Sequence, residues 1–134
     1  ARAAMKTNNE AKARAAYAQV KTIATGEMGA EAQYFEAYFK YLDGTHETSN
    51  ESVQELIKKF SSYKYYASKG LIIMAKNFLA LDDVFQATYI LENVIQNFTE
   101  FPEITAEAQV ELDRIKTEAA KTNASIEVDS ENEN

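Results

Sequence analysis

The sequence has 134 residues, which suits a single domain, and 46 % of them are hydrophobic, which is enough for a continuous core. Four glycines, one proline and no cysteine argue against a strand-rich fold and exclude disulfides, cysteine-based metal sites and a cysteine nucleophile. The formal net charge of −7 disfavours general nucleic-acid binding, and no apolar run approaches the length of a membrane span.

The N-terminal part predicts a helical stub followed by a longer helix. Residues 1–6 resemble the rear of a truncated helix, so we expect the chain to be the C-terminal part of a longer protein. A turn is expected at residues 7–9, where Asn9 can cap a helix over residues 10–24. Residues 1–25 carry a net charge of +4, which fits either ordinary solvated helix faces or a basic patch that continues into preceding repeats.

The central part of the sequence predicts two helical hairpins. Apolar residues recur at spacings of three and four, which is typical of a helix with one apolar face. The polar segments 43–45 and 81–83 are so short that the helices they join must run antiparallel. Gly70 lies inside a helix, where glycine costs about 1 kcal/mol relative to alanine, and so indicates close packing. The predicted helices are 30–42, 50–60, 63–81 and 83–98.

The C-terminal part predicts one helix and a tail. Pro102 suits the first turn of a helix over residues 102–121. That helix has a narrow apolar stripe and a charged opposite face, as a terminal capping helix requires. Residues 122–134 are polar and acidic without periodicity, which predicts a disordered acidic tail.

The hairpins share a recurring pattern of core residues. Small or medium residues occur at successive separations of 12, 4 and 3, the small ones allowing close approach of the two helices. The same separations occur three times, in sets that begin at positions 1, 37 and 75. The three sets are Ala1, Ala13, Tyr17 and Val20; Ala37, Ser49, Val53 and Leu56; Ala75, Ala87, Leu91 and Val94.

This pattern resembles the tetratricopeptide repeat family, whose unit is a helix–turn–helix of about 34 residues. The resemblance implies an all-α, tetratricopeptide-like helical-hairpin array (an α-solenoid) over residues 1–121. Its units would be about 1–26, 30–63 and 68–101, followed by the capping helix 102–121. Glu36 and Lys40 stand where the family usually has leucine and an aromatic residue, and Ser49 replaces the usual alanine. The amino-acid sequences of some segments also resemble those of large repeat proteins of Bacteroidetes-type bacteria, which suggests the cell envelope or periplasm as location.

No catalytic, cofactor-binding or metal-binding constellation is apparent. His46 is the only histidine and is expected at the surface of a turn, and Asp82-Asp83 is interpreted as a turn and capping pair. We therefore expect no enzymatic activity and no cofactor.

A tyrosine stripe is the best candidate for a binding site. Tyr34, Tyr38 and Tyr41 share one helix face, and first-helix positions line the concave groove in the family that this sequence resembles. We expect these tyrosines to be partly exposed, and Phe35 and Phe39 to be buried. The alternative is that the stripe packs between repeats or is covered by the chain's own last helix. The predicted partner-binding residues are Tyr34, Tyr38, Tyr41, Lys69, Ile72 and Lys76.

The sequence thus predicts a non-enzymatic protein–protein interaction or scaffold module of a larger bacterial protein, binding a peptide or protein in its groove. Two alternatives remain at this point. The chain could be a structural C-terminal end-piece of a longer solenoid, or a regulatory domain of an enzyme encoded upstream. The carboxylate clamp of some family members is not expected, because only Lys76 is basic among the corresponding positions.

Overall fold

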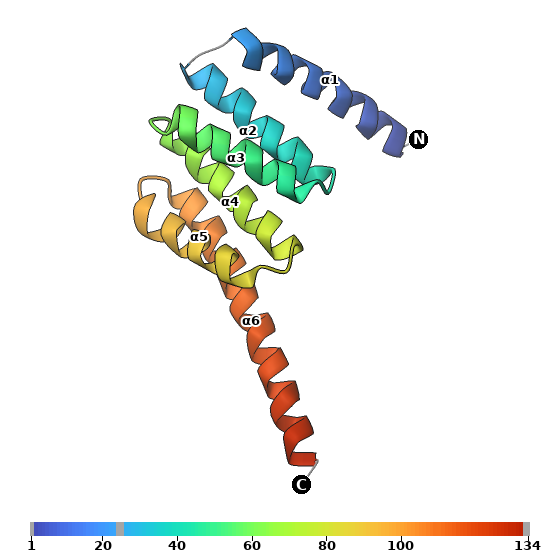
Figure 1. Ribbon diagram of the computed structural model, residues 1–134, viewed down its shortest axis with the longest axis vertical. Coiled ribbons are helices and arrows are strands. Elements are labelled where there is room, and N and C mark those ends of the chain that lie inside the picture. Colours follow the sequence, from blue (N-terminus) through green and yellow to red (C-terminus); the bar gives the residue numbers. More distant parts are fainter. Residues whose placement is uncertain (1, 24–25, 133–134) are drawn as a thin grey trace.

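The computed structural model describes the backbone of residues 2–23 and 26–132 and the side chains of residues 9–19 and 26–122. Within these ranges the chain is helical and contains no strand, which confirms the predicted all-α class (Figure 1). The helices are α1 (Arg2–Ile23), α2 (Gly26–Leu42), α3 (His46–Phe60), α4 (Lys64–Ala80), α5 (Val84–Asn97) and α6 (Pro102–Asn132).

Each helix packs against the next one along the chain, so that α1 to α5 form a stack from which α6 projects (Figure 1). Helix α2 also contacts α4, and α4 contacts α6, whereas α3 and α5 do not contact each other within the described residues. One side of the stack is therefore built by α2, α4 and α6 in succession, and α3 and α5 lie on its other side.

The two hairpin turns have the same backbone structure. Gly44 and Asp82 both adopt left-handed backbone angles, with φ of 80° and 61°. The Gly44 N–H donates to the carbonyl of Tyr41 at 3.0 Å, and the Asp82 N–H donates to that of Leu79 at 3.1 Å. The hairpins α2–α3 and α4–α5 thus repeat one unit, in which Gly44 corresponds to Asp82.

The links between units repeat in the same register. The Tyr63 N–H donates to the carbonyl of Phe60 at 3.0 Å, and one unit later the Phe101 N–H donates to that of Phe98 at 3.0 Å. Helix α6 therefore begins where the first helix of a further unit would begin.

The residues at the predicted separations of 12, 4 and 3 form the core of the two hairpins. All eight residues of the second and third sets have exposed fractions of 0 %, and Ala13 and Tyr17 of the first set are partly exposed. Val20 and Ala1 lie outside the residues whose side chains are described. A Cβ atom on Gly70 would lie 2.7 Å from Leu56 Cδ2, so the predicted close approach at this glycine is confirmed.

Replacing Asp82 by glycine should raise the free energy of unfolding by about 0.5–1 kcal/mol. An L-amino acid in the left-handed region is roughly 1–2 kcal/mol less stable than in the right-handed region, and glycine removes this cost. The larger conformational entropy of glycine in the unfolded chain offsets part of that gain in stability. Urea denaturation measures the change. Gly44→Ala, at the equivalent position, is the matched control and should be destabilising. A destabilised Asp82→Gly variant would contradict the equivalence of the turns.

Two predicted boundaries are wrong. Helix α1 is continuous through residues 7–9, where a turn was expected. Thr and Asn have modest helix propensities, but without Gly or Pro their cost is only tenths of a kcal/mol per residue. Helix α6 continues past Lys121 to Asn132, into the segment expected to be disordered. That segment likewise contains neither Gly nor Pro.

Helix α3 starts at His46 and not at residue 50 as expected, and no side chain caps its N-terminus. The Ser49 hydroxyl donates to the Ala37 carbonyl at 2.7 Å, and the Thr48 hydroxyl donates to the Thr45 carbonyl at 3.0 Å. In α5, by contrast, Asp83 caps the helix by accepting from the Gln86 N–H at 3.1 Å.

Candidate functional site

Tyrosines of α2 and α4 form a continuous aromatic surface on the side of the stack built by α2, α4 and α6. Tyr38 stacks on both Tyr34 and Tyr41, with ring centroids 6.2 and 6.4 Å away. Tyr65 of α4 continues the surface toward α6 and meets the ring of Phe101 edge-on at 5.6 Å. We call this surface the aromatic face; it comprises Tyr34, Tyr38, Tyr41, Tyr65, Lys69 and Lys76.

The two lysines of the aromatic face are held in place by neighbouring side chains. Lys69 Nζ lies 4.8 Å from the ring centroid of Tyr34 and 5.3 Å from that of Tyr65, which are cation–π distances. Lys76 Nζ lies 3.3 Å from Glu107 Oε1 of α6. The structure thus places Lys69 between two tyrosines and Lys76 beside α6.

Tyr38 and Tyr41 are partly exposed as expected, but the expected exposure of Tyr34 and the expected burial of the two phenylalanines are wrong. Tyr34 is only 7 % exposed, whereas Phe35 and Phe39 are half-buried. Tyr34 packs against α4, where Tyr66 lies 6.2 Å away, while Phe35 faces α1 and stacks on Tyr17 at 4.4 Å. Which residue is buried is therefore set by the neighbouring helix.

Burial changes the pKa of Tyr34. It also excludes Ile72 as a partner-binding residue. Desolvation, followed by the negative charge of Glu107, raises the pKa of Tyr34 above its ordinary value. Ile72 is 2 % exposed and belongs to the core. Tyr38, Tyr41, Lys69 and Lys76 remain half-buried, and Tyr65, which the sequence prediction missed, is 37 % exposed.

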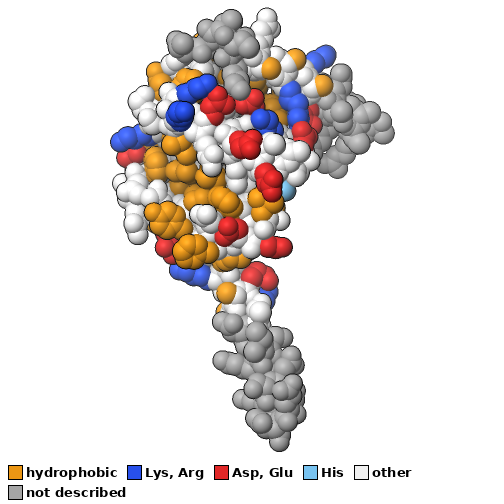
Figure 2. All heavy atoms as spheres, in the orientation of Figure 1, with side chains coloured by type: hydrophobic (Ala, Val, Ile, Leu, Met, Phe, Trp, Pro, Cys, Tyr) orange, Lys and Arg blue, Asp and Glu red, His pale blue; other side chains and the backbone are white. Residues whose placement is uncertain are grey.

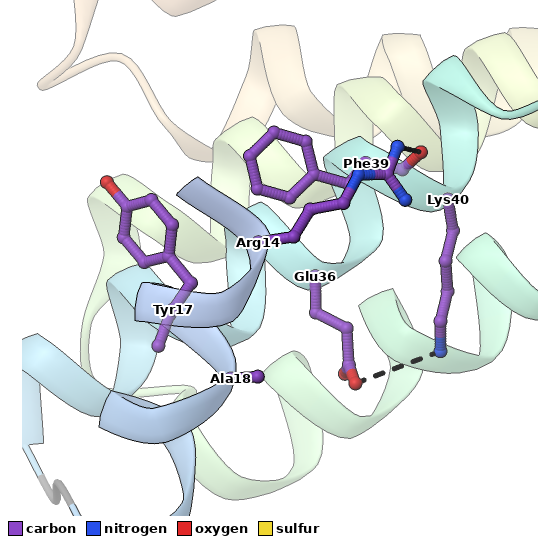
Figure 3. Close-up of a pocket in the computed structure, with 7 residues that line it drawn as sticks. Arg14, Tyr17, Ala18, Glu36, Phe39 and Lys40 are labelled. Carbon is purple, nitrogen blue, oxygen red and sulfur yellow. Dashed lines mark hydrogen bonds and ion pairs between the residues drawn. The ribbon is translucent and has the colours of Figure 1, made fainter. Parts of the chain in front are cut away.

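A pocket of about 190 Å³ lies between α1 and α2 (Figure 3). Arg14 extends from α1 over the ring of Phe39, with its Cζ atom 5.0 Å from the ring centroid. Its guanidinium donates to Asp43 and Glu10, each at 2.7 Å, and these bonds raise the pKa of Arg14 further. The lining residues are Arg14, Tyr17, Ala18, Ala32, Glu36, Phe39 and Lys40.

Polar residues in this pocket explain two departures from the repeat pattern. Lys40 Nζ donates to Ser52 Oγ at 2.8 Å, and the Gln33 amide donates to the Ser52 carbonyl at 2.9 Å and to Glu36 at 3.0 Å. Glu36 and Lys40 thus belong to a polar network between α2 and α3. The charged side chains that line the pocket, Arg14, Glu36 and Lys40, all have partners within the chain.

His46 begins α3 and is half-buried, so its expected place at the surface of a turn is wrong. Its Nδ1 atom lies 2.8 Å from Asn77 Oδ1, and because a carbonyl oxygen only accepts, Nδ1 must donate. Within the described residues, no group of three or more histidine and acidic side chains could hold a metal ion. None of the described helices combines the length and apolarity needed to cross a membrane.

Comparison of this chain with protein-family models, with curated proteins and with solved structures gave no match.

Proposed function

We propose that this chain is a tetratricopeptide-like array that binds a peptide or protein segment on its aromatic face, without enzymatic activity. Two kinds of observation support the proposal. The helical-hairpin unit recurs with equivalent turns, and first helices contact each other in succession on one side of the stack. The aromatic face lies on that side.

The aromatic face has the chemistry of a peptide-binding surface. Tyrosine offers a large contact area with few rotatable bonds and a hydroxyl that can bond to a peptide backbone. Because Lys69 is held between the rings of Tyr34 and Tyr65, little side-chain entropy is lost when it binds a partner. The half-buried state of Tyr38, Tyr41 and the two lysines is the observation that carries the proposal.

One observation favours the alternative of a structural end-piece. Tyr34 and Ile72, two of the six predicted contact residues, are buried by the chain itself. In that alternative the remaining tyrosines serve only packing, so their removal would change stability without changing the binding of any peptide.

The proposal can be tested with peptides selected from a displayed random library on the wild-type protein. Such peptides should bind the double variant Tyr38→Ala, Lys69→Ala at least about tenfold more weakly, because two contact side chains are lost. Fluorescence anisotropy gives the dissociation constants, and circular dichroism checks that the variant is folded.

The matched control is Lys58→Ala, which removes an exposed lysine side chain on α3, outside the aromatic face. Its peptide affinities should equal those of the wild type. Selected peptides that bind the double variant as tightly as the wild type would refute binding on the aromatic face.

A further inference from the structure

Helix α5 carries an exposed apolar stripe that the aromatic face does not include. Phe85 is 82 % exposed and Tyr89 is 64 % exposed, and the separation of four residues places both on one face of the helix. Val84 and Leu81, 50 % and 40 % exposed, adjoin them. Hydrophobic side chains gather over α4 and α5 on the side of the molecule seen in Figure 2. We call Leu81, Val84, Phe85 and Tyr89 the α5 patch.

The hairpin array itself does not require apolar residues at these positions. At the equivalent places on α3, one unit earlier in the chain, stand Glu47 and Glu51. Both glutamates are exposed, as are Phe85 and Tyr89. Packing between units therefore explains neither aromatic residue.

Acidic side chains predominate around the α5 patch, and Arg114 of α6, which lines a pocket together with Val84, is paired with Glu111 at 3.1 Å. Between Lys76 and Arg114 the sequence has eight acidic residues and no basic residue. Asp82 and Glu92 stand three residues before Phe85 and three residues after Tyr89, so acidic side chains flank the aromatic pair on both sides. Both are exposed, and neither forms an ion pair with another described residue. An apolar patch between exposed carboxylates is complementary to an apolar surface bordered by cations.

We propose that the α5 patch docks a basic amphipathic helix of a protein partner. The apolar side of that helix would cover Phe85 and Tyr89, and its lysines or arginines would lie against Asp82 and Glu92. From residue 82 to residue 92 the stripe is about 15 Å long, which matches about three turns of a partner helix. A second copy fits less well, since it would bring another charge of −7 to an acidic surface.

The test uses a labelled synthetic peptide of about 18 residues, with leucines on one helix face and lysines on the other. Its affinity is measured by fluorescence anisotropy for the wild type and for the double variant Phe85→Glu, Tyr89→Glu. The variant adds two negative charges, so purely electrostatic attraction would tighten binding. Docking on the apolar patch predicts binding weakened by about tenfold or more. Equal or tighter binding would overturn the proposal.

Three controls make the test specific. The variant should fold, which circular dichroism shows, because α3 carries glutamate at both equivalent positions. Glu47→Gln, Glu51→Gln removes two negative charges from α3, a change of equal size and opposite sign that does not touch the α5 patch, and this variant should bind the peptide as the wild type does. A peptide with glutamate in place of lysine should not bind; if it binds as tightly, charge complementarity is refuted.

Two further measurements separate this proposal from other possibilities. Tyr38→Ala, Lys69→Ala should bind the leucine–lysine peptide normally; if only this variant loses binding, the peptide occupies the aromatic face and the α5 proposal fails. Sedimentation velocity should show a monomeric wild type. A dimer that Phe85→Glu, Tyr89→Glu dissociates would assign the α5 patch to self-association instead.

Discussion

Replacing Asn77 by isoleucine is expected to lower the free energy of unfolding by about 3 kcal/mol or more. Asn77 of α4 is fully buried, and its amide donates to Ser49 Oγ at 2.8 Å and to Asn50 Oδ1 at 2.9 Å. It also accepts from His46 Nδ1 at 2.8 Å. Isoleucine would leave buried polar groups of α3 without partners, and each such group costs about 1–3 kcal/mol. The larger side chain would also overpack the site.

The neighbouring unit supplies the matched control for this substitution. One unit later in the chain, the four polar positions are occupied by Val84, Ala87, Thr88 and Ile115. The fourfold variant His46→Val, Ser49→Ala, Asn50→Thr, Asn77→Ile therefore gives the contact between α3 and α4 the same set, in which most of the polar groups are absent. It should recover most of the stability that Asn77→Ile loses, because replacing all partners together leaves few groups unsatisfied.

Urea denaturation of the wild type, the single variant and the fourfold variant measures both effects. If Asn77→Ile alone costs under about 1 kcal/mol, the hydrogen-bond network does not hold α3 and α4 together. If the single variant is destabilised and the fourfold variant gains nothing back, the two units are not equivalent in packing.

Ending the chain at Phe101 is expected to abolish cooperative folding. Helix α6 buries Ile104, Ala108 and Leu112 against the rest of the stack, with exposed fractions of 3 %, 0 % and 4 %. Burial of each large apolar side chain contributes roughly 1.5–3 kcal/mol to the free energy of unfolding. The core residues that α6 covers would also become exposed in the shortened chain, with a comparable loss of stability. The sum approaches the whole stability of a domain this size, which is about 5–15 kcal/mol.

A chain that ends at Asn123 is the control for this deletion. It keeps every buried residue of the described part of α6, the last of which is Leu112, and the partly buried Ile115. Its thermal melt and its sedimentation should match those of the full chain. A monomeric, cooperatively melting product that ends at Phe101 would show that α6 is not needed to cover the stack.

The repeating core could be predicted from the sequence because it depends on spacing within a helical hairpin. Ala75, Ala87, Leu91 and Val94 are buried as their separations predicted. Gly70 likewise marks a close approach, since a glycine inside a helix is costly and is favoured only where a side chain would not fit. The core separations are local to one hairpin, whereas the close approach at Gly70 is to Leu56 of the preceding hairpin and is indicated by the glycine itself.

The candidate site could be predicted only in part, because exposure depends on neighbours that are distant in sequence. Tyr34 and Phe35 are adjacent on α2, but α4 covers the first, whereas the second faces α1. No pattern within α2 reveals which neighbour covers more. The hydrogen bond between His46 and Asn77 was missed for the same reason, since it joins residues 31 positions apart.

Chemical-shift mapping of a library-selected peptide on the isotope-labelled protein tests the central claim most directly. At 15.0 kDa, the chain gives resolvable amide spectra. Binding on the aromatic face predicts that the largest perturbations occur at Tyr38, Tyr41, Lys69 and their neighbours on α2 and α4. Perturbations confined to α3 and α5, or to the pocket between α1 and α2, would contradict it.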